Sequence, residues 1–150
     1  MLKPEIQIIV RSAHGYDAEL IAPTRGSAWA SGVDLRADIG TTREMRSGER
    51  WIFGTGVYLA IPPGYEGQVR SRSGLAAHHG VVCPTGTIDC DYRGEVKVIL
   101  INTSGLEFTV KPHDRIGQLV ISPVADPAWR RVAELDQTDR GTGGLGSTGR

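Results

Sequence analysis

The sequence predicts an all-β protein: an antiparallel jelly-roll-like barrel or sandwich with one short helix and a flexible C-terminal arm. Glycine and proline are abundant, at 20 and 8 of 150 residues, and they stand between short apolar runs. That distribution is typical of many short strands joined by turns. The runs are β-branched or alternate with polar residues. No window of a dozen residues has the 3.6-residue apolar period of a long helix.

The apolar runs predict roughly eight to ten strands. In chain order they cover positions 6–10, 51–53, 57–61, the surroundings of Val69, 81–82, 96–101, 108–110 and 116–121. Pro62-Pro63-Gly64-Tyr65 predicts a turn, because proline fixes φ and glycine permits a positive φ. The single predicted helix is Leu75–His79, which Gly80 ends. A chain of this length is expected to form one domain over residues 1–150.

Composition argues against two classes of partner. Seventeen basic residues balance 17 acidic ones, so there is no overall field to hold a nucleic acid or an anionic membrane. The apolar stretch Ile6–Val10 is too short for a signal peptide or a membrane span, and we expect a cytoplasmic protein. Cys83 and Cys90 are seven apart, a spacing that indicates reduced structural thiols and no zinc site.

The last segment, residues 138–150, is rich in glycine and has little apolar surface to anchor it, so we expect a mobile arm. Gly141, Gly143 and Gly146 fit the spacing of a dinucleotide fingerprint. Only four residues follow Gly146, too few for the helix that this motif requires. Two interpretations of the arm stay open: a phosphate wrap made by backbone amides, or a flexible linker.

Five separated segments together resemble the five motifs of the trimeric dUTPase family. Each is weak alone, but they occur in order from Ala30 to Gly149 in a glycine-punctuated β chain. They are Ala30-Ser31-Gly32-Val33-Asp34-Leu35-Arg36-Ala37, Arg72-Ser73-Gly74-Leu75-Ala76, Gly86-Thr87-Ile88-Asp89-Cys90-Asp91-Tyr92-Arg93-Gly94-Glu95, Asp114-Arg115-Ile116-Gly117-Gln118-Leu119, and residues 140–149.

The resemblance implies an enzyme that hydrolyses dUTP to dUMP and pyrophosphate in a homotrimer whose active sites are shared between subunits. It implies that Asp89 is the base that activates water for attack on the α-phosphate, and that Asp34 supports the phosphate network. It also implies Mg²⁺ held by the triphosphate and waters without a direct protein ligand. His78 and His79 are a poor chelating pair, because adjacent residues on a helix point about 100° apart.

The same resemblance assigns the residues that bind the substrate. Phosphate oxygens would be met by Arg72, Ser73, Gly74 and Gln118, and uracil by the backbone of Gly86, Thr87 and Ile88. Tyr92 would lie under the deoxyribose and exclude a 2′-hydroxyl. The arm residues implied to close over the γ-phosphate are Arg140, Gly144, Leu145, Gly146 and Ser147.

Each of these residues also has a purely structural interpretation if its motif is set aside. Asp34 and Asp89 would be turn formers, Arg72 a helix cap, Gln118 an outward polar residue of a strand and Tyr92 a core aromatic. The five motifs in order favour the functional interpretation.

Two departures from the family pattern bear on activity. Leu145 stands where the family usually has an aromatic over the uracil, which would weaken closure by about 0.5–1.5 kcal/mol. Ser71 replaces a common proline, and we expect a looser turn there.

Two alternative functions are compatible with parts of the sequence. The dCTP deaminase branch of the fold needs a glutamate ten residues beyond Asp89, where this chain has Ile99. A nucleotide-binding regulatory protein without turnover is the second alternative, and intact Asp89 argues against it.

Overall fold

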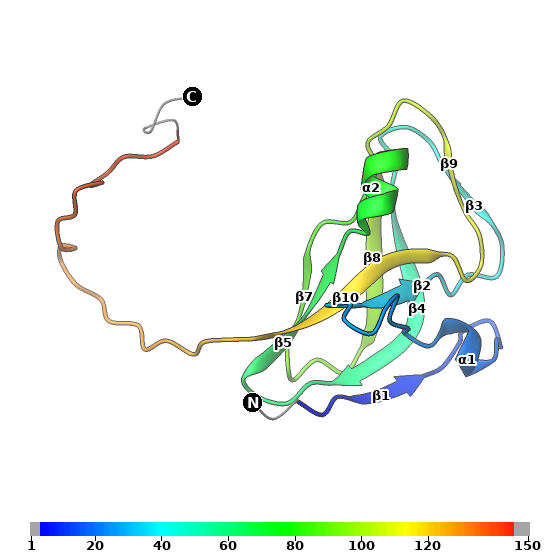
Figure 1. Ribbon diagram of the computed structural model, residues 1–150, viewed down its shortest axis with the longest axis horizontal. Helices are drawn as coiled ribbons and strands as arrows, with labels where there is room; N and C mark the ends of the chain where they lie inside the picture. The colour runs from blue at the N-terminus through cyan, green and yellow to red at the C-terminus, as the bar shows by residue number, and fades with distance from the viewer. Residues whose placement is uncertain (1–3, 146–150) are drawn as a thin grey trace.

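The computed structural model describes residues 4–145, whose strands form two four-stranded antiparallel sheets and one two-stranded sheet (Figure 1). The first sheet has the order β1-β4-β8-β6, the second β2-β10-β5-β7, and the small sheet pairs β3 with β9. The strands are β1 Gln7–Val10, β2 Val33–Arg36, β3 Arg43–Met45, β4 Arg50–Ala60, β5 Tyr65–Arg70, β6 Val81–Val82, β7 Gly86–Ile88, β8 Glu95–Asn102, β9 Phe108–Val110 and β10 Arg115–Pro123.

Ten strands in the described residues agree with the number predicted, and the all-β jelly-roll-type class is confirmed. The two runs predicted at 51–53 and 57–61 belong to one strand, β4, whose register against β8 shifts between Gly54 and Val57. Three strands were not expected from apolar alternation: β2, β3 and β7. They have three or four residues each and carry at most two apolar side chains.

The core lies between the two large sheets and takes side chains from both. Phe53, Val57 and Val98 of the first sheet and Leu35 and Ile116 of the second are at most 1% exposed. The alternating burial of β8, with every second residue buried from Val96 to Asn102, is the period-two pattern of a strand with one face inward.

Two short helices accompany the sheets, where the sequence predicted one. The predicted helix is present as α2, Ser73–His79, and begins two residues earlier than expected. Gly80 ends it in the left-handed conformation, with φ of 62°, as predicted. The additional helix is α1, Ala18–Ile21, a single turn capped by Asp17 and anchored by buried Ile21. A four-residue helix is too short to give a periodic signal.

After β10 the chain leaves the body as an extended segment (Figure 1). From Pro123 to Leu145 nearly every residue is exposed, including Trp129, Val132 and Leu135. The mobility of residues 138–150 stays a prediction.

In the described part of the chain, neither helix is long or apolar enough to cross a membrane. Both cysteines are free thiols, in agreement with the sequence. Burial raises the pKa of the Cys83 thiol, and its Sγ donates to the Pro84 carbonyl oxygen at 3.3 Å.

Asn102 joins the small sheet to β8, and its replacement is expected to be costly. Its buried side-chain amide donates to the carbonyl oxygens of Met45 (2.9 Å) and Leu106 (2.7 Å), and its Oδ1 accepts from Ser104. We expect Asn102→Ala to lower the free energy of unfolding by about 2–3 kcal/mol, because the buried Met45 carbonyl oxygen and the Leu106 carbonyl oxygen lose their donor. Urea denaturation measures this loss. The exposed Glu107→Gln is the control, and equal stability of the two variants would contradict the assignment.

Candidate active site

Asp34 pairs with two arginines in the wall of a cleft of about 240 Å³. Its Oδ1 accepts from Arg72 Nε at 3.1 Å and its Oδ2 from Arg115 Nη1 at 3.2 Å. Arg72 Nη1 also donates to the Arg115 carbonyl oxygen at 2.9 Å. Two guanidinium groups and one carboxylate leave this cleft with net positive charge, which suits an anionic ligand.

The cleft forms where three strand ends and a helix start come together. It is lined by Gly26, Ala30, Gly32, Asp34, Arg72, Ser73, Gly74, Arg115 and Gln118. Asp34 lies on β2 and Gln118 on β10, and the two are register partners. Arg72 is the N-cap of α2, so the free amides of the first helical turn face the same region.

Gln118 and Ser71 fix the segment between β5 and α2. Gln118 Nε2 donates to the Ser71 carbonyl oxygen at 2.8 Å. The Ser71 hydroxyl donates to the Cys83 carbonyl oxygen at 2.9 Å and accepts from the Cys83 amide at 2.7 Å. The expected loosening of this turn by Ser71 is therefore wrong, because the hydroxyl supplies two hydrogen bonds across the turn.

Gly32 lets the loop before β2 lie against β10. A Cβ at this position would stand 2.9 Å from the Leu119 carbonyl oxygen and 3.1 Å from Gln118 Oε1. Both neighbours belong to the wall of the cleft or its supporting strand, so a side chain here would push the loop away from Asp34.

A second cleft, of about 320 Å³, gathers the residues of the third motif. It is lined by Ile52, Thr87, Ile88, Asp89, Tyr92, Glu95, Lys97 and Ile99. Asp89 directly follows β7, and the Tyr92 amide donates to the Asp89 carbonyl oxygen in a tight turn. Ile99, which stands where the deaminase branch requires glutamate, lies in the same cleft as Asp89. Its apolar side chain cannot transfer protons, which argues against deaminase chemistry.

Glu95 and Tyr92 brace this second cleft. The Tyr92 hydroxyl donates to the Glu95 carbonyl oxygen at 3.0 Å, which orients the ring while leaving it 42% exposed. The Glu95 carboxylate accepts from the amides of Thr55 and Gly56 at the bulge of β4. Glu95 is thereby occupied with the backbone, whereas the exposed Tyr92 ring can meet a ligand.

The two clefts lie apart within one chain. Gln118 pairs with Arg70 on β5, whereas Ile88 pairs with Gly67, so Asp89 stands near the level of Glu66. Asp89 is therefore four residues along the sheet and two strands across from Gln118, and the two residues are separated by a distance on the order of 15 Å. The structure thus brings together Asp34, Arg72, Ser73, Gly74 and Gln118 in one cleft and Thr87, Ile88, Asp89 and Tyr92 in another, with Gly86 at the start of β7.

The predicted arm residues lie in neither cleft. Arg140 is exposed and its Nε donates to the Gly143 carbonyl oxygen at 3.0 Å within the arm itself. Leu145 is fully exposed, and Gly144 precedes it. Gly146 and Ser147 lie outside the described residues.

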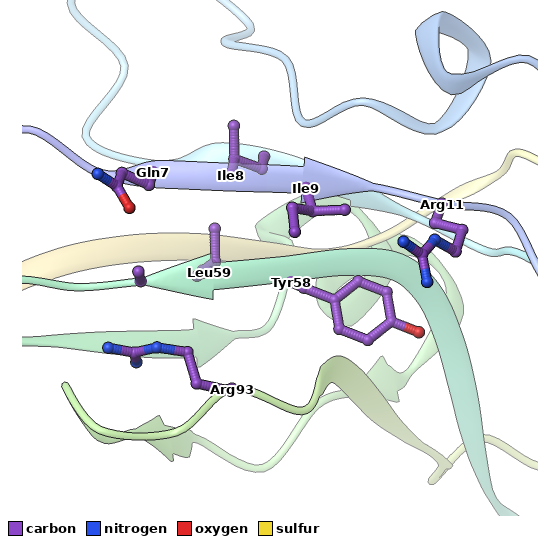
Figure 2. Close-up of a pocket in the computed structure, with 8 residues that line it drawn as sticks. Gln7, Ile8, Ile9, Arg11, Tyr58, Leu59 and Arg93 are labelled. Atoms are coloured by element: carbon purple, nitrogen blue, oxygen red, sulfur yellow. The ribbon is translucent and has the colours of Figure 1, made fainter.

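Another cleft, of about 380 Å³, runs along β1 and β4 and contains none of the predicted site residues. Figure 2 shows Ile8 and Ile9 of β1 beside Tyr58 and Leu59 of β4, with Gln7, Arg11 and Arg93 around them. Chemistry is better supported at the two clefts above, because they hold the carboxylates and the paired arginines.

Arg115 is the functional candidate that sequence reasoning left without a role. It stands inside the fourth motif, but its link to Asp34 spans 81 positions and only the fold creates it. A register shift in β10 between Arg115 and Gly117 turns its side chain toward Asp34.

Among residues 4–145, no three His, Cys, Asp or Glu side chains are grouped closely enough to hold a metal ion. Both carboxylate oxygens of Asp34 face arginines. Asp34 is thus engaged by guanidinium groups, and the way in which Mg²⁺ is held stays a prediction.

Comparison with known proteins identifies relatives across nearly the whole chain. A family model described as dUTPase matches residues 18–149. The deoxyuridine 5′-triphosphate nucleotidohydrolase of Syntrophotalea carbinolica is 50% identical over 146 residues, covering 96% of this chain and 97% of that protein.

Solved structures agree in fold. The dUTPase of Staphylococcus bacteriophage 80alpha, solved with dUPNHPP, gives a TM-score of 0.84 at 25% identity, covering 97% of this chain and 99% of that one. A mutant dUTPase of phage phi11 of S. aureus, solved to describe the coordination of a structural Mg(II) ion, gives a TM-score of 0.76 at 23% identity over 89% and 99%.

Proposed function

The chain belongs to the dUTPase family, and from that premise we propose that Asp89 activates the water with which it cleaves dUTP to dUMP and pyrophosphate. It is a dUTP diphosphatase, a hydrolase of a phosphoanhydride bond. The observation that supports the proposal best is the pair of complementary clefts: one offers two arginines for phosphate, and the other offers a carboxylate beside an exposed aromatic ring.

The water attacks the α-phosphorus while Asp89 takes its proton. A bond forms between the water oxygen and the α-phosphorus, and the bond from that phosphorus to the oxygen bridging to the β-phosphorus breaks. Pyrophosphate leaves with the bridging oxygen. Asp89 suits this role because it lies at a strand end in an open cleft, where water can reach it.

The phosphate oxygens are bound by Arg72, Ser73, Gly74 and Gln118. Asp34 positions Arg72 by accepting a hydrogen bond from its Nε. Ser73 and Gly74 add the free amides of the first turn of α2. Mg²⁺ is the cofactor, and when bound through the triphosphate it neutralises charge on the phosphates. The arm then closes, with Arg140 and the amides around Gly144 meeting the γ-phosphate and Leu145 covering the nucleotide.

A homotrimer with shared active sites accounts for the two separate clefts, because a phosphate cleft of one subunit can face the Asp89 cleft of another. Ile52 and Ile99 are cross-strand partners on the outer face of the first sheet and are 58% and 36% exposed, which supports an interface there. We expect light scattering to give three times the 16.2 kDa of one chain. A monomer that hydrolyses dUTP would contradict the shared site.

Uracil is selected by the backbone of Gly86, Thr87 and Ile88, and the sugar by Tyr92. We expect Tyr92→Ala to narrow the preference for dUTP over UTP by about tenfold or more, because the ring no longer blocks a 2′-hydroxyl. Steady-state kinetics on both nucleotides measures the ratio. Tyr92→Phe keeps the ring and should keep the preference; loss of the preference in both variants would show that the hydroxyl group, and not the ring, is responsible.

The experiment that tests the function is pyrophosphate release from dUTP with Mg²⁺, run beside dCTP, dTTP and UTP. Selective release from dUTP is expected. Ammonia release from dCTP would favour the deaminase branch, and dUTP binding without turnover would favour a regulatory protein.

A further inference from the structure

Trp29 carries an almost fully exposed indole on a loop that lines the phosphate cleft, the cleft of Asp34, Arg72 and Arg115. Its side chain is 96% exposed, and residues on either side of it in the chain, Gly26 and Ala30, line the cleft with Asp34 and Arg72. One exposed apolar residue is ordinary on a protein surface. The phosphate cleft has to be covered during the reaction so that water is excluded. An exposed indole on a loop that lines it is therefore a candidate contact for the segment that covers it.

The loop that carries Trp29 is anchored on both sides. Arg25 Nη1 donates to the Ala30 carbonyl oxygen, and the Ala30 amide donates to the Ser27 carbonyl oxygen at 3.2 Å. The Asp34 amide donates to the Thr24 carbonyl oxygen at 2.7 Å. The loop is held by these bonds without any packing of the indole, so Trp29 is presented to a partner on a fixed support.

The arm carries an exposed apolar side chain, Leu145, that can contact the indole. Between positions 138 and 145, Leu145 is the only large apolar residue, and it is fully exposed. Leu145 is the 22nd residue after Pro123, where β10 ends, and a chain of that length can extend up to roughly 70 Å. It can therefore reach the phosphate cleft of its own subunit or of a neighbouring one.

We propose that Trp29 is the platform on which the arm closes, through contact between the indole and the part of the Leu145 side chain that does not cover the nucleotide. The aromatic member of the closed site then lies on the loop before β2, and the arm supplies the aliphatic member. Trp29 is a positioning residue in this scheme, because it acts through the arm. The inference rests on the proposed function, since it concerns closure of the same site.

A double-mutant cycle tests the contact. We expect Trp29→Ala and Leu145→Ala each to lower kcat/KM for dUTP by about threefold to tenfold. The kcat/KM of the double variant should equal that of the less active single variant, because both substitutions remove the same contact. Trp29→Phe should restore most of the loss. Leu106→Ala, which removes an exposed leucine between β8 and β9, is the control and should leave kcat/KM unchanged.

Tryptophan fluorescence supplies a second measurement that a merely structural role would not change. In the free protein, acrylamide should quench Trp29. Addition of α,β-imido-dUTP with Mg²⁺ should shield it and shift its emission to the blue. The Trp29 component is the difference between the wild type and Trp29→Phe, which removes the contributions of Trp51 and Trp129. Leu145→Ala should abolish the shift.

Additive effects in the cycle, or an indole already shielded in the free protein, would overturn the inference. A shift that survives Leu145→Ala would also overturn it, because Trp29 would then contact the nucleotide directly. Absence of dUTP turnover in the wild type would instead refute the proposed function. Normal turnover with an unaffected Trp29→Ala variant would refute only the inference.

Discussion

Asp89→Asn is expected to lower kcat for dUTP by about 10²–10⁴-fold, the usual contribution of a positioned general base. Asparagine keeps the shape of the side chain but cannot accept a proton from water. The KM should change little, because Asp89 acts on the attacking water, whereas the phosphates are held by the residues of the other cleft. Stopped assays of pyrophosphate release over long times measure the residual rate.

Asp126→Asn removes the same charge from an exposed position beyond β10 and is the matched control. Its kcat should equal that of the wild type. Retention of more than about a tenth of wild-type kcat by Asp89→Asn would remove Asp89 from the role of base, since proton transfer contributes more than that.

Arg72→Ala is expected to have the second largest effect, a loss of about 10²–10³-fold in kcat, comparable to removal of one donor to a developing anion. The substitution removes a guanidinium group from the phosphate cleft and leaves Asp34 with Arg115 alone. Arg70→Ala is the matched control, because Arg70 is exposed and its side chain donates to Gln68 on the same strand. Similar losses in the two variants would indicate a general effect of positive charge and contradict a specific site.

Mixing the two inactive variants distinguishes a shared site from a site within one chain. If Asp89 and Arg72 of one site come from different subunits, random trimers of Asp89→Asn and Arg72→Ala chains carry both intact residues in about a quarter of their sites. Activity should therefore return on refolding the two variants together. If both residues of a site came from one chain, every site would lack one of them and no activity would return.

The end of α2 and the long strands could be predicted, because the residues that signal them lie within or next to the element itself. Gly80 ends α2 as expected, since a left-handed residue at that point favours glycine. The apolar runs predicted the strands β4, β8 and β10, which have 11, 8 and 9 residues, and β8 alternates between buried and more exposed residues over most of its length. The single turn α1 has too few residues to show a period, and the missed strands β2, β3 and β7 carry at most two apolar side chains each.

The candidate site could be predicted only as a set of residues. The motifs identify Asp34, Arg72 and Asp89, but they do not indicate that Asp89 lies in a different cleft from the other two. That division depends on strand register, which motifs do not contain. Arg115 was overlooked for the same reason, because its partner Asp34 is distant in sequence.

The effect of Ser71 could not be inferred from the proline that the family commonly has at this position. The loss of a proline predicts a freer backbone, yet the hydroxyl group bonds to both the amide and the carbonyl oxygen of Cys83. The segment that carries Arg72 is therefore held by side-chain hydrogen bonds in place of a ring.

Hydrolysis of dUTP in ¹⁸O-labelled water, with mass spectrometry of both products, tests the central claim most directly. Attack of an Asp89-activated water on the α-phosphorus places the label in dUMP and leaves pyrophosphate unlabelled. Label in pyrophosphate would show attack on the β-phosphorus and contradict the mechanism.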